Sequence, residues 1–343
     1  MSKGISNKGL EAVNEYRNQM ALANGVSEET IREGVHFSVS PSVQQKLENE
    51  VTLSSEFLKQ INTIGVNELA GETLRLGASK SIASRTDTGS GARRKGANLT
   101  GLKAHSYQCQ QTNFDTILRY SQIDAWAKFK DLPSRVAKIK ASRIALDRIM
   151  IGWHGTKAAK TTNLEENPLL QDVNIGWLKH IETNADEQVQ ESIEIDPKTE
   201  KASEYKTLDA VVFDMLNKYM PEEYRDDTNL VVIVGRKLLA DKYFPLQNDP
   251  TPTEKLAGDT IISQKRVGGL RAVTVPYFPE TGLLITRLDN LSIYYQDGAM
   301  RRALINDPAV DGFIDYVSSN DAYVVENYDA VVYVKEVTLK GEE

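Results

Sequence analysis

The side chains most often used for metal binding and nucleophilic catalysis are few and widely spaced in this chain. The four histidines are His36, His105, His154 and His180, and Cys109 is the only cysteine. A zinc site needs several such ligands together, usually through local HExxH or CxxC spacing, and no such spacing occurs. A single thiol excludes a disulfide within the chain and is typical of a reducing cytosolic origin. The sequence therefore predicts no metal site and no cofactor.

Glycine-rich and acidic motifs also lack the residues that nucleotide binding or catalysis needs. GSGARRKG at 89–96 has no GKS or GKT ending, and its GSG tripeptide is not a GxSxG nucleophile motif. VVIVGRKLLA at 231–240 holds one glycine where a dinucleotide fingerprint needs three. The adjacent carboxylates at 165–166 and 226–227 stand in loops, where such pairs are usually solvated. We predict that the protein is not an enzyme, with an unrecognised catalytic site as the alternative.

Charge is distributed unevenly along the chain. Between Glu72 and Arg148, Lys and Arg outnumber Asp and Glu by 15 to 6, although the whole chain has a formal charge of −7. A chain with a basic third and an acidic remainder can attract other copies of itself, but clustering on a solvated surface explains the pattern equally simply. No nucleic-acid reader motif occurs, so weak, sequence-independent contact with phosphate is the expected limit.

The first 40 residues predict a helical tail followed by an extended segment. Residues 1–34 have the pattern of two short helices, with Gly25 ending the first and Ser27 capping the second. The tail is otherwise polar, which indicates a detachable amphipathic segment and no secretory signal. An extended stretch at 35–39 then precedes a helix that begins at Ser40-Pro41.

A long segment at 68–112 changes character. It is rich in Gly, Ser, Thr, Lys and Arg, and therefore cannot bury enough apolar surface to fold as a compact unit. Its two flanks alternate apolar and polar residues as β-strands do. We predict a protruding two-stranded arm with Arg93, Arg94 and Lys95 at or near its tip.

The remainder predicts a long helix followed by mixed helices and strands. The helix spans about five turns from 133 to 151, and Gly152 is expected to end it. Its expected apolar face consists of Val136, Ile139, Leu146 and Met150. The basic residues, expected mostly on other faces, are Lys138, Lys140, Arg143 and Arg148. The apolar run at 230–234 predicts a buried strand, and strands dominate 312–339. The class is α+β with mixed sheets, and no apolar run of about 18 residues predicts a membrane span.

Several longer segments resemble the major capsid proteins of peduovirus-type tailed bacteriophages (the P-two group). The resemblance runs in order from Phe37 almost to the end, and its clearest stretches are LVVIVGRKLLADKYFP at 230–245, DTIISQKRVGGLRAVTVPYFP at 259–279 and LLITRLDNLSIYYQDGAMRR at 283–302.

The resemblance implies the tailed-phage capsid fold of the Hong Kong 97 type. Its implied divisions are a removable, scaffold-interacting helical segment at 1–37, an N-arm at 38–66, the arm called the E-loop at 67–112, a peripheral domain with a spine helix at 113–166, an axial domain at 167–298 and C-terminal strands returning to the peripheral domain at 299–343.

The implied function is self-assembly, as hexamers and pentamers, into an icosahedral shell around double-stranded DNA in the bacterial cytoplasm. An internal scaffold that carries a protease would trim the chain near Phe37/Ser38, and a portal would be a further partner. Arg93, Arg94 and Lys95 would contact acidic surfaces of neighbouring subunits. Basic residues expected on the inner surface are Lys138, Lys140 and Arg143. The alternative is an encapsulin-like shell of the same fold around a protein cargo, for which no scaffold-directed trimming is needed.

Overall fold

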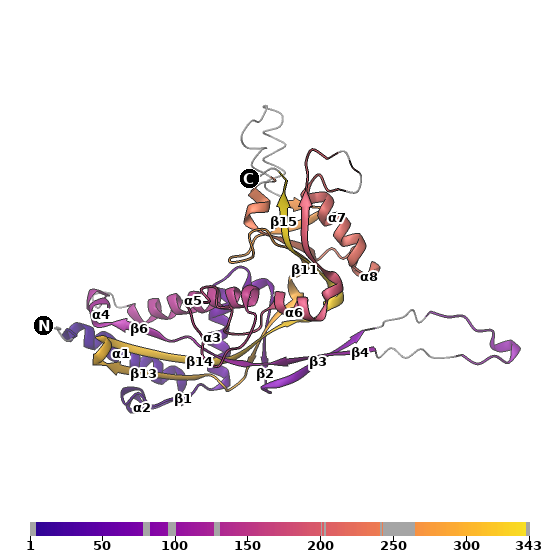
Figure 1. The fold of residues 1–343 in the computed structure, drawn as a ribbon. Coiled ribbons are helices and arrows are strands. Elements are labelled where there is room, and N and C mark those ends of the chain that lie inside the picture. The colour runs from indigo at the N-terminus through magenta and orange to yellow at the C-terminus, as the bar shows by residue number, and fades with distance from the viewer. Residues whose placement is uncertain are drawn as a thin grey trace.

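The structure is a computed structural model that describes residues 5–77, 83–94, 101–126, 131–199, 201, 204–240, 242 and 265–340. It has an elongated part, a smaller part set above it, and an arm that projects away from both (Figure 1). Within the described residues, no helix is both long and apolar enough to cross a membrane.

The two predicted N-terminal helices are confirmed as α1 (Asn7–Asn24) and α2 (Glu28–Arg32). The Ser6 hydroxyl caps α1 by accepting from the Gly9 amide, and the αL residue Gly25 ends the helix. The segment is not a free tail, however, because Val13 and Ile31 are buried against the elongated part. The apolar stripe of α1 therefore has a partner surface in the same chain.

The next elements lead from the N-terminal helices towards the arm. The extended stretch is confirmed as β1 (Phe37–Ser38), and the helix that follows is α3 (Pro41–Leu53). Pro41 stands at the start of α3 as predicted, although the Ser40 side chain makes no capping hydrogen bond. Strand β2 (Asn62–Val66) follows and belongs to the seven-stranded sheet described below.

The predicted two-stranded arm is present. Strands β3 (Ala70–Gly77) and β4 (Gly101–Gln108) are antiparallel, with Ala70 opposite Gln108 and Gly77 opposite Gly101. Within the described part of the arm, the 3-10 turn η2 (Thr88–Ser90) lies near the far end (Figure 1). These strands pair only with each other among the described strands, as expected for a segment without a core of its own.

A seven-stranded sheet forms the base of the elongated part. Its main strand order is β1-β13-β14-β12-β2, and two short strands also pair with the long strand β14. The strands not yet placed are β5 (Gln110–Asn113), β6 (Thr116–Arg119), β12 (Leu291–Gln296), β13 (Arg301–Asp307) and β14 (Gly312–Val325).

Helix α5 (Leu132–His154) runs along this sheet, with α4 (Tyr120–Trp126) before it (Figure 1). The predicted end at Gly152 is wrong, since the helix continues for another half-turn. Gly152 instead makes room for Trp177, whose ring would lie 2.2 Å from a Cβ at that position. The glycine serves close packing between helices rather than helix termination.

The predicted faces of α5 are also partly wrong. Ile139 was expected to be buried and is 58% exposed, whereas Lys140 and Arg148 are 8% and 2% exposed. Both cations are buried because carboxylates from the distant strand β14 pair with them, which burial of a charge requires.

The smaller part contains a six-stranded sheet in the order β7-β15-β11-β8-β10-β9. The run at 230–234 is confirmed as a fully buried strand. Helix α6 (Trp177–Asn184) lies where the two parts meet and contacts α5, β14 and a strand of the smaller sheet, β15. The other elements of the smaller part are β7 (Val189–Ile195), α7 (Leu208–Tyr219), α8 (Glu222–Arg225), β8 (Leu230–Val234), β9 (Arg266–Val267), β10 (Leu270–Val273), β11 (Leu283–Arg287) and β15 (Val331–Leu339).

The expected boundary at 299, between the axial domain and the C-terminal strands, does not coincide with the division of the strands between the two sheets. Strand β12 lies before that boundary but belongs to the seven-stranded sheet. Strand β15 lies after it but pairs with β11 and β7 in the six-stranded sheet, so the segment 299–343 does not return as a whole to the elongated part. The last two long strands run consecutively but separate into different sheets.

One hydrophobic core joins the two sheets. It contains Ile233 and Leu284 from the six-stranded sheet together with Ile293 and Val325 from the seven-stranded sheet. Aromatic rings gather around Trp177 in this core, with the Trp153 ring centroid at 4.9 Å and the Tyr323 centroid at 5.4 Å. The two sheets are therefore packed as one unit.

Candidate assembly surfaces

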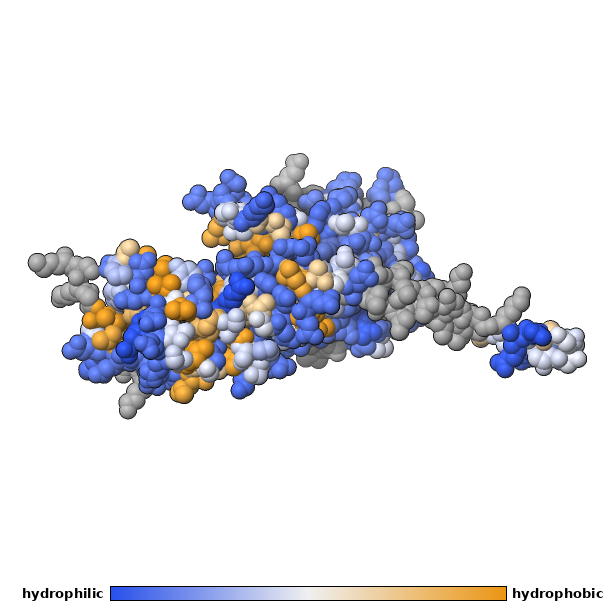
Figure 2. All heavy atoms as spheres, turned by 90° about the horizontal axis from the view of Figure 1, so that it is seen from below, coloured by the Kyte–Doolittle hydropathy of each residue, from blue (hydrophilic) through white to orange (hydrophobic). Residues whose placement is uncertain are grey.

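The described segment 83–94, which contains two of the three predicted arm contacts, lies at the far end of the arm (Figure 1). Arg93 and Arg94 are exposed and follow the 3-10 turn η2, while Lys95 lies outside the described residues. Figure 2 shows the arm tip as hydrophilic to near-neutral, and it shows the apolar side chains of the visible face gathered on the body. The described tip thus offers charge rather than apolar surface to a neighbour.

The predicted cleavage position lies in an edge strand. Phe37 pairs with Arg302 and Ser38 with Arg301 of β13, and β1 is the outermost strand of its sheet. The Phe37 side chain is buried, whereas Ser38 is exposed. A protease that binds an extended substrate therefore needs this two-residue strand to leave β13 first.

The three basic residues predicted for an inner surface have different environments. Lys138 and Arg143 are exposed on α5, and Arg143 forms an ion pair with Asp147 one turn later. Lys140 is buried, and its ammonium lies 3.1 Å from the Asp315 carboxylate. The expectation that Lys140 lies on an inner surface is therefore wrong, because its ammonium is buried and paired with Asp315 inside the fold.

Lys140 belongs to a buried polar cluster beneath α1. Arg302 donates to both Asp315 oxygens at 3.1 and 2.8 Å, and Tyr16 of α1 donates to the same carboxylate at 2.9 Å. Burial raises the pKa of Asp315, but Arg302 and then Lys140 outweigh burial and bring it down to about 2. Burial raises the pKa of Tyr16, so the tyrosine stays neutral.

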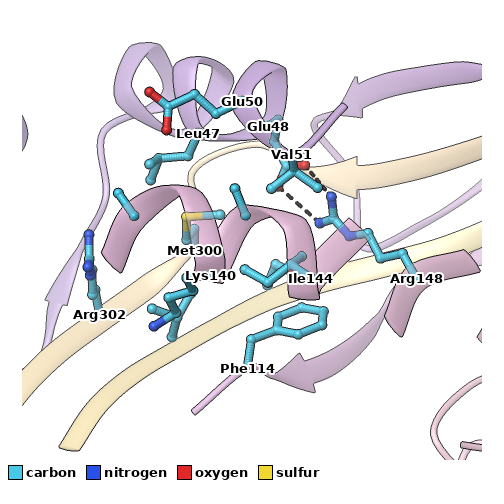
Figure 3. Close-up of a pocket in the computed structure, with 14 residues that line it drawn as sticks. Leu47, Glu48, Glu50, Val51, Phe114, Lys140, Ile144, Arg148, Met300 and Arg302 are labelled. Atoms are coloured by element: carbon cyan, nitrogen blue, oxygen red, sulfur yellow. Dashed lines mark hydrogen bonds and ion pairs between the residues drawn. The ribbon is translucent and has the colours of Figure 1, made fainter. Parts of the chain in front are cut away.

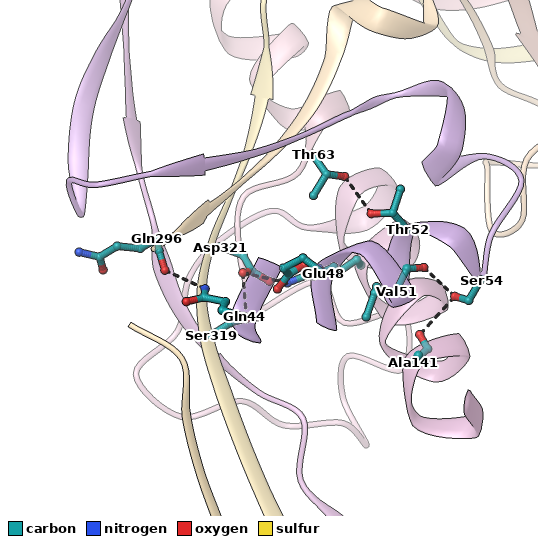
Figure 4. A network of polar contacts seen from close by, with 11 residues as sticks. Gln44, Glu48, Val51, Thr52, Ser54, Thr63, Ala141, Gln296, Ser319 and Asp321 are labelled. Atoms are coloured by element: carbon teal, nitrogen blue, oxygen red, sulfur yellow. Dashed lines mark hydrogen bonds and ion pairs between the residues drawn. The ribbon is translucent and has the colours of Figure 1, made fainter. Parts of the chain in front are cut away.

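A second buried cluster fastens α3 to α5 and β14 (Figure 4). Arg148 donates to both Glu48 carboxylate oxygens and lies 3.0 Å from Asp321. Ser319 also donates to Asp321, at 2.8 Å. Burial raises the pKa of Glu48 beyond what Arg148 offsets, because one guanidinium serves two carboxylates. The sequence prediction missed this cluster entirely.

A small cavity of about 70 Å³ lies between α3 and α5, next to these clusters (Figure 3). Its walls are mainly apolar, with Leu47, Val51, Phe114 and Ile144 among them. Four of the charged residues that line it, Glu48, Lys140, Arg148 and Arg302, are paired with other side chains. No group of three or more possible metal ligands occurs within the described ranges. The arrangement fits a packing gap between helices rather than a reaction centre.

Solved structures show that this architecture is the tailed-phage capsid fold. The structure titled "Satellite phage P4 procapsid including size determination (Sid) protein" matches with a TM-score of 0.77 and 39% identity, over 96% of this chain and 98% of that one. A chain of Microbacterium phage Oxtober96 matches with a TM-score of 0.50 at 13% identity, over 83% and 91%. The class is the Hong Kong 97 type of capsid protein.

Sequence comparison identifies the family within this class. A family model described as "Phage major capsid protein, P2 family" matches residues 12–337. "Capsid proteins" of Escherichia phage P2 are 41% identical over 95% of this chain and 93% of the relative. The "Major capsid protein" of Serratia phage KSP20 is 35% identical over 98% of both. The chain belongs to the P2 family of phage major capsid proteins, which are structural proteins and not enzymes.

Proposed function

We propose that many copies of this chain assemble, as hexamers and pentamers, into an icosahedral shell that encloses double-stranded phage DNA. Family membership over residues 12–337 carries the proposal, and it supports a phage capsid over a protein-cargo compartment. A long charged arm that projects beyond the body suits contact with adjacent subunits. Electron microscopy of the chain co-expressed with its scaffold in a bacterium should show closed icosahedral particles. Amorphous or purely monomeric product would contradict the proposal.

In this proposal the seven-stranded sheet and α5 form the peripheral domain, and the six-stranded sheet forms the axial domain. The N-arm is 38–66 and the E-loop is 67–112, as the resemblance implies. Strand β12 joins the peripheral domain and β15 joins the axial domain, following their hydrogen-bonded partners. The exposed Lys138 and Arg143 remain candidates for sequence-independent contact with packaged DNA. A portal is the further partner, and assembly takes place in the host cytoplasm.

Maturation is proposed to cut the chain near Phe37/Ser38, through a protease carried by the internal scaffold. Strand β1 pairs over only two residues at a sheet edge, so it can open locally without unfolding the sheet. Mass spectrometry of mature particles should find chains that begin at or near Ser38. Particles made without an active protease are the control and should retain residue 1. Intact N-termini in infectious particles would refute the cleavage.

Arg93, Arg94 and Lys95 are proposed to contact acidic surfaces of neighbouring subunits. Reversing all three to Glu should lower particle yield or thermal stability, because a small interaction is repeated at every subunit interface. The unassembled chain should keep its circular dichroism and melting temperature, since the arm pairs apart from both larger sheets.

The matched control for the arm is a reversal of the exposed lysines Lys157, Lys160 and Lys198 to Glu, which changes net charge equally on the body. Particle yield or the melting temperature of the particles should fall further in the arm variant than in this control. Equal responses would assign the effect to net charge, and normal particles from the arm variant would show that the three residues are not interface contacts.

A further inference from the structure

The N-terminal segment, residues 5–37, is packed on the elongated part as a ligand is packed in a groove. The walls of the groove come from α4, α5, β13 and β14, and they contribute the buried side chains Ile123, Val136, Leu304 and Phe313. From α1 and α2, the segment inserts the buried side chains Val13, Met20, Ala21 and Ile31. These contacts form a hydrophobic core of their own between segment and body.

Polar contacts fix the register of α1 in this groove. The Tyr16 hydroxyl donates to Asp315 at 2.9 Å and accepts from Arg302 at 2.8 Å. At the start of the helix, the Ser6 amide and hydroxyl both donate to the Asp124 carboxylate of α4, at 3.0 and 2.6 Å. Such directional contacts permit one position of the helix along the groove.

The contacts that hold the segment in its groove do not involve the peptide bond between Phe37 and Ser38. The apolar and polar contacts described above join residues 6–31 to the body, and Phe37 itself is buried beside β13. Cutting that bond removes the covalent connection but leaves these contacts in place. In a closed shell the severed segments would also remain at high local concentration, which favours rebinding.

We propose that this groove is a specific binding site for residues 5–37 and that it retains the segment after the chain is cut. The inference rests on the proposed N-terminal cleavage. Cutting and departure are then separate steps, and the segment masks an apolar surface until it is displaced or cut further. Its departure exposes Ile123, Val136, Leu304 and Phe313 in each subunit.

The test uses the full-length chain with a recognition sequence for a site-specific protease inserted between Val35 and His36, both of which are exposed. The purified protein is cut and passed over a size-exclusion column under native conditions, and mass spectrometry quantifies the segment in each fraction. We expect the segment to co-elute with the body in equal amounts. Recovery of the segment mainly in the low-mass fractions would overturn the proposal.

Substitutions on α1 distinguish specific binding in the groove from non-specific hydrophobic association. Val13→Asp, at a buried position, should move the segment to the low-mass fractions after cutting, while Leu22→Asp, at a position 83% exposed, should not. Tyr16→Phe keeps the ring and removes the hydroxyl, and should raise the dissociation constant about tenfold. Equal retention of all three variants would also overturn the proposal.

The assay is independent of natural maturation, because the inserted site is cut in vitro. Absence of cleavage in mature particles would refute the proposed maturation. The in vitro assay would still test whether the groove binds the segment. Loss of the segment from the cut wild-type protein would refute the groove while leaving the maturation proposal unchanged. Circular dichroism before cutting checks that each variant is folded.

Discussion

Replacing Arg148 by Met should destabilise the unassembled chain by about 3–5 kcal/mol, because it leaves Glu48 and Asp321 buried without a counter-charge. The side chains of these two acids are 3% and 0% exposed, so bulk solvent does not reach them in the folded chain. Denaturant unfolding of the unassembled protein measures the change. The effect should appear even in the absence of assembly, since the cluster lies within one chain.

Arg143→Met is the matched control for this prediction. Arg143 is on the same helix and also pairs with a carboxylate, but its side chain is 55% exposed. Exposed pairs of this kind contribute about 0–1 kcal/mol, so the control should change stability little. Similar losses for both variants would show that the buried cluster has no special role.

The loss in Arg148→Met should also depend on pH in a defined direction. Arg148 lowers the pKa of Glu48 against the effect of burial, so without Arg148 the folded-state pKa of Glu48 lies further above its unfolded value. Glu48 therefore takes up a proton more readily in the folded variant than in the unfolded chain, and this protonation offsets part of the loss as pH falls. The difference from wild type should shrink on acidification. A difference that grows would contradict this account.

Replacing Trp177 by Ala should cost about 3–5 kcal/mol of stability, as large aromatic deletions in cores do. Trp177 is fully buried where the two sheets share one core, and its indole nitrogen donates to the Ser292 carbonyl at 2.9 Å. The substitution leaves a cavity at the junction and removes the hydrogen bond to the Ser292 carbonyl. Denaturant unfolding should show the loss, and the two sheets should become less tightly coupled.

Trp126→Ala provides the comparison for Trp177. Trp126 ends α4 and is 38% exposed, so its removal takes less apolar surface out of the core. A clearly smaller loss of unfolding free energy is expected. A loss as large as that of Trp177→Ala would mean that the junction between the sheets is not the sensitive point of the core.

Local sequence patterns determined several elements and their ends. Gly25 and Ser27 fix the boundary between α1 and α2, because an αL position and a capping hydroxyl are local requirements. The apolar run at 230–234 could only be satisfied by burial on both faces, and it is a central strand. The composition of 68–112 likewise excluded a core and predicted the arm. The family resemblance supplied the class of protein, which these patterns alone did not.

The spine helix shows a signal that the sequence contained and the prediction did not use. Val136, Lys140, Ile144 and Arg148 are spaced by four and therefore share one face of α5. Two of the four are cations, so that face appeared interrupted rather than buried. Their partners in β14 are 173 to 175 residues away, and the second partner of Arg148, Glu48 in α3, is 100 residues away. No local pattern reports a pairing over such distances.

The tertiary structure alone decided which surfaces meet. Strands β14 and β15 have similar apolar patterns and are neighbours in the sequence, yet they enter different sheets because their hydrogen-bonded partners differ. The N-terminal segment has the composition of a free tail but is docked, because Asp315 and Phe313 happen to lie where α1 can reach them. Periodicity specifies which face of an element is buried, while the partner of that face depends on the rest of the fold.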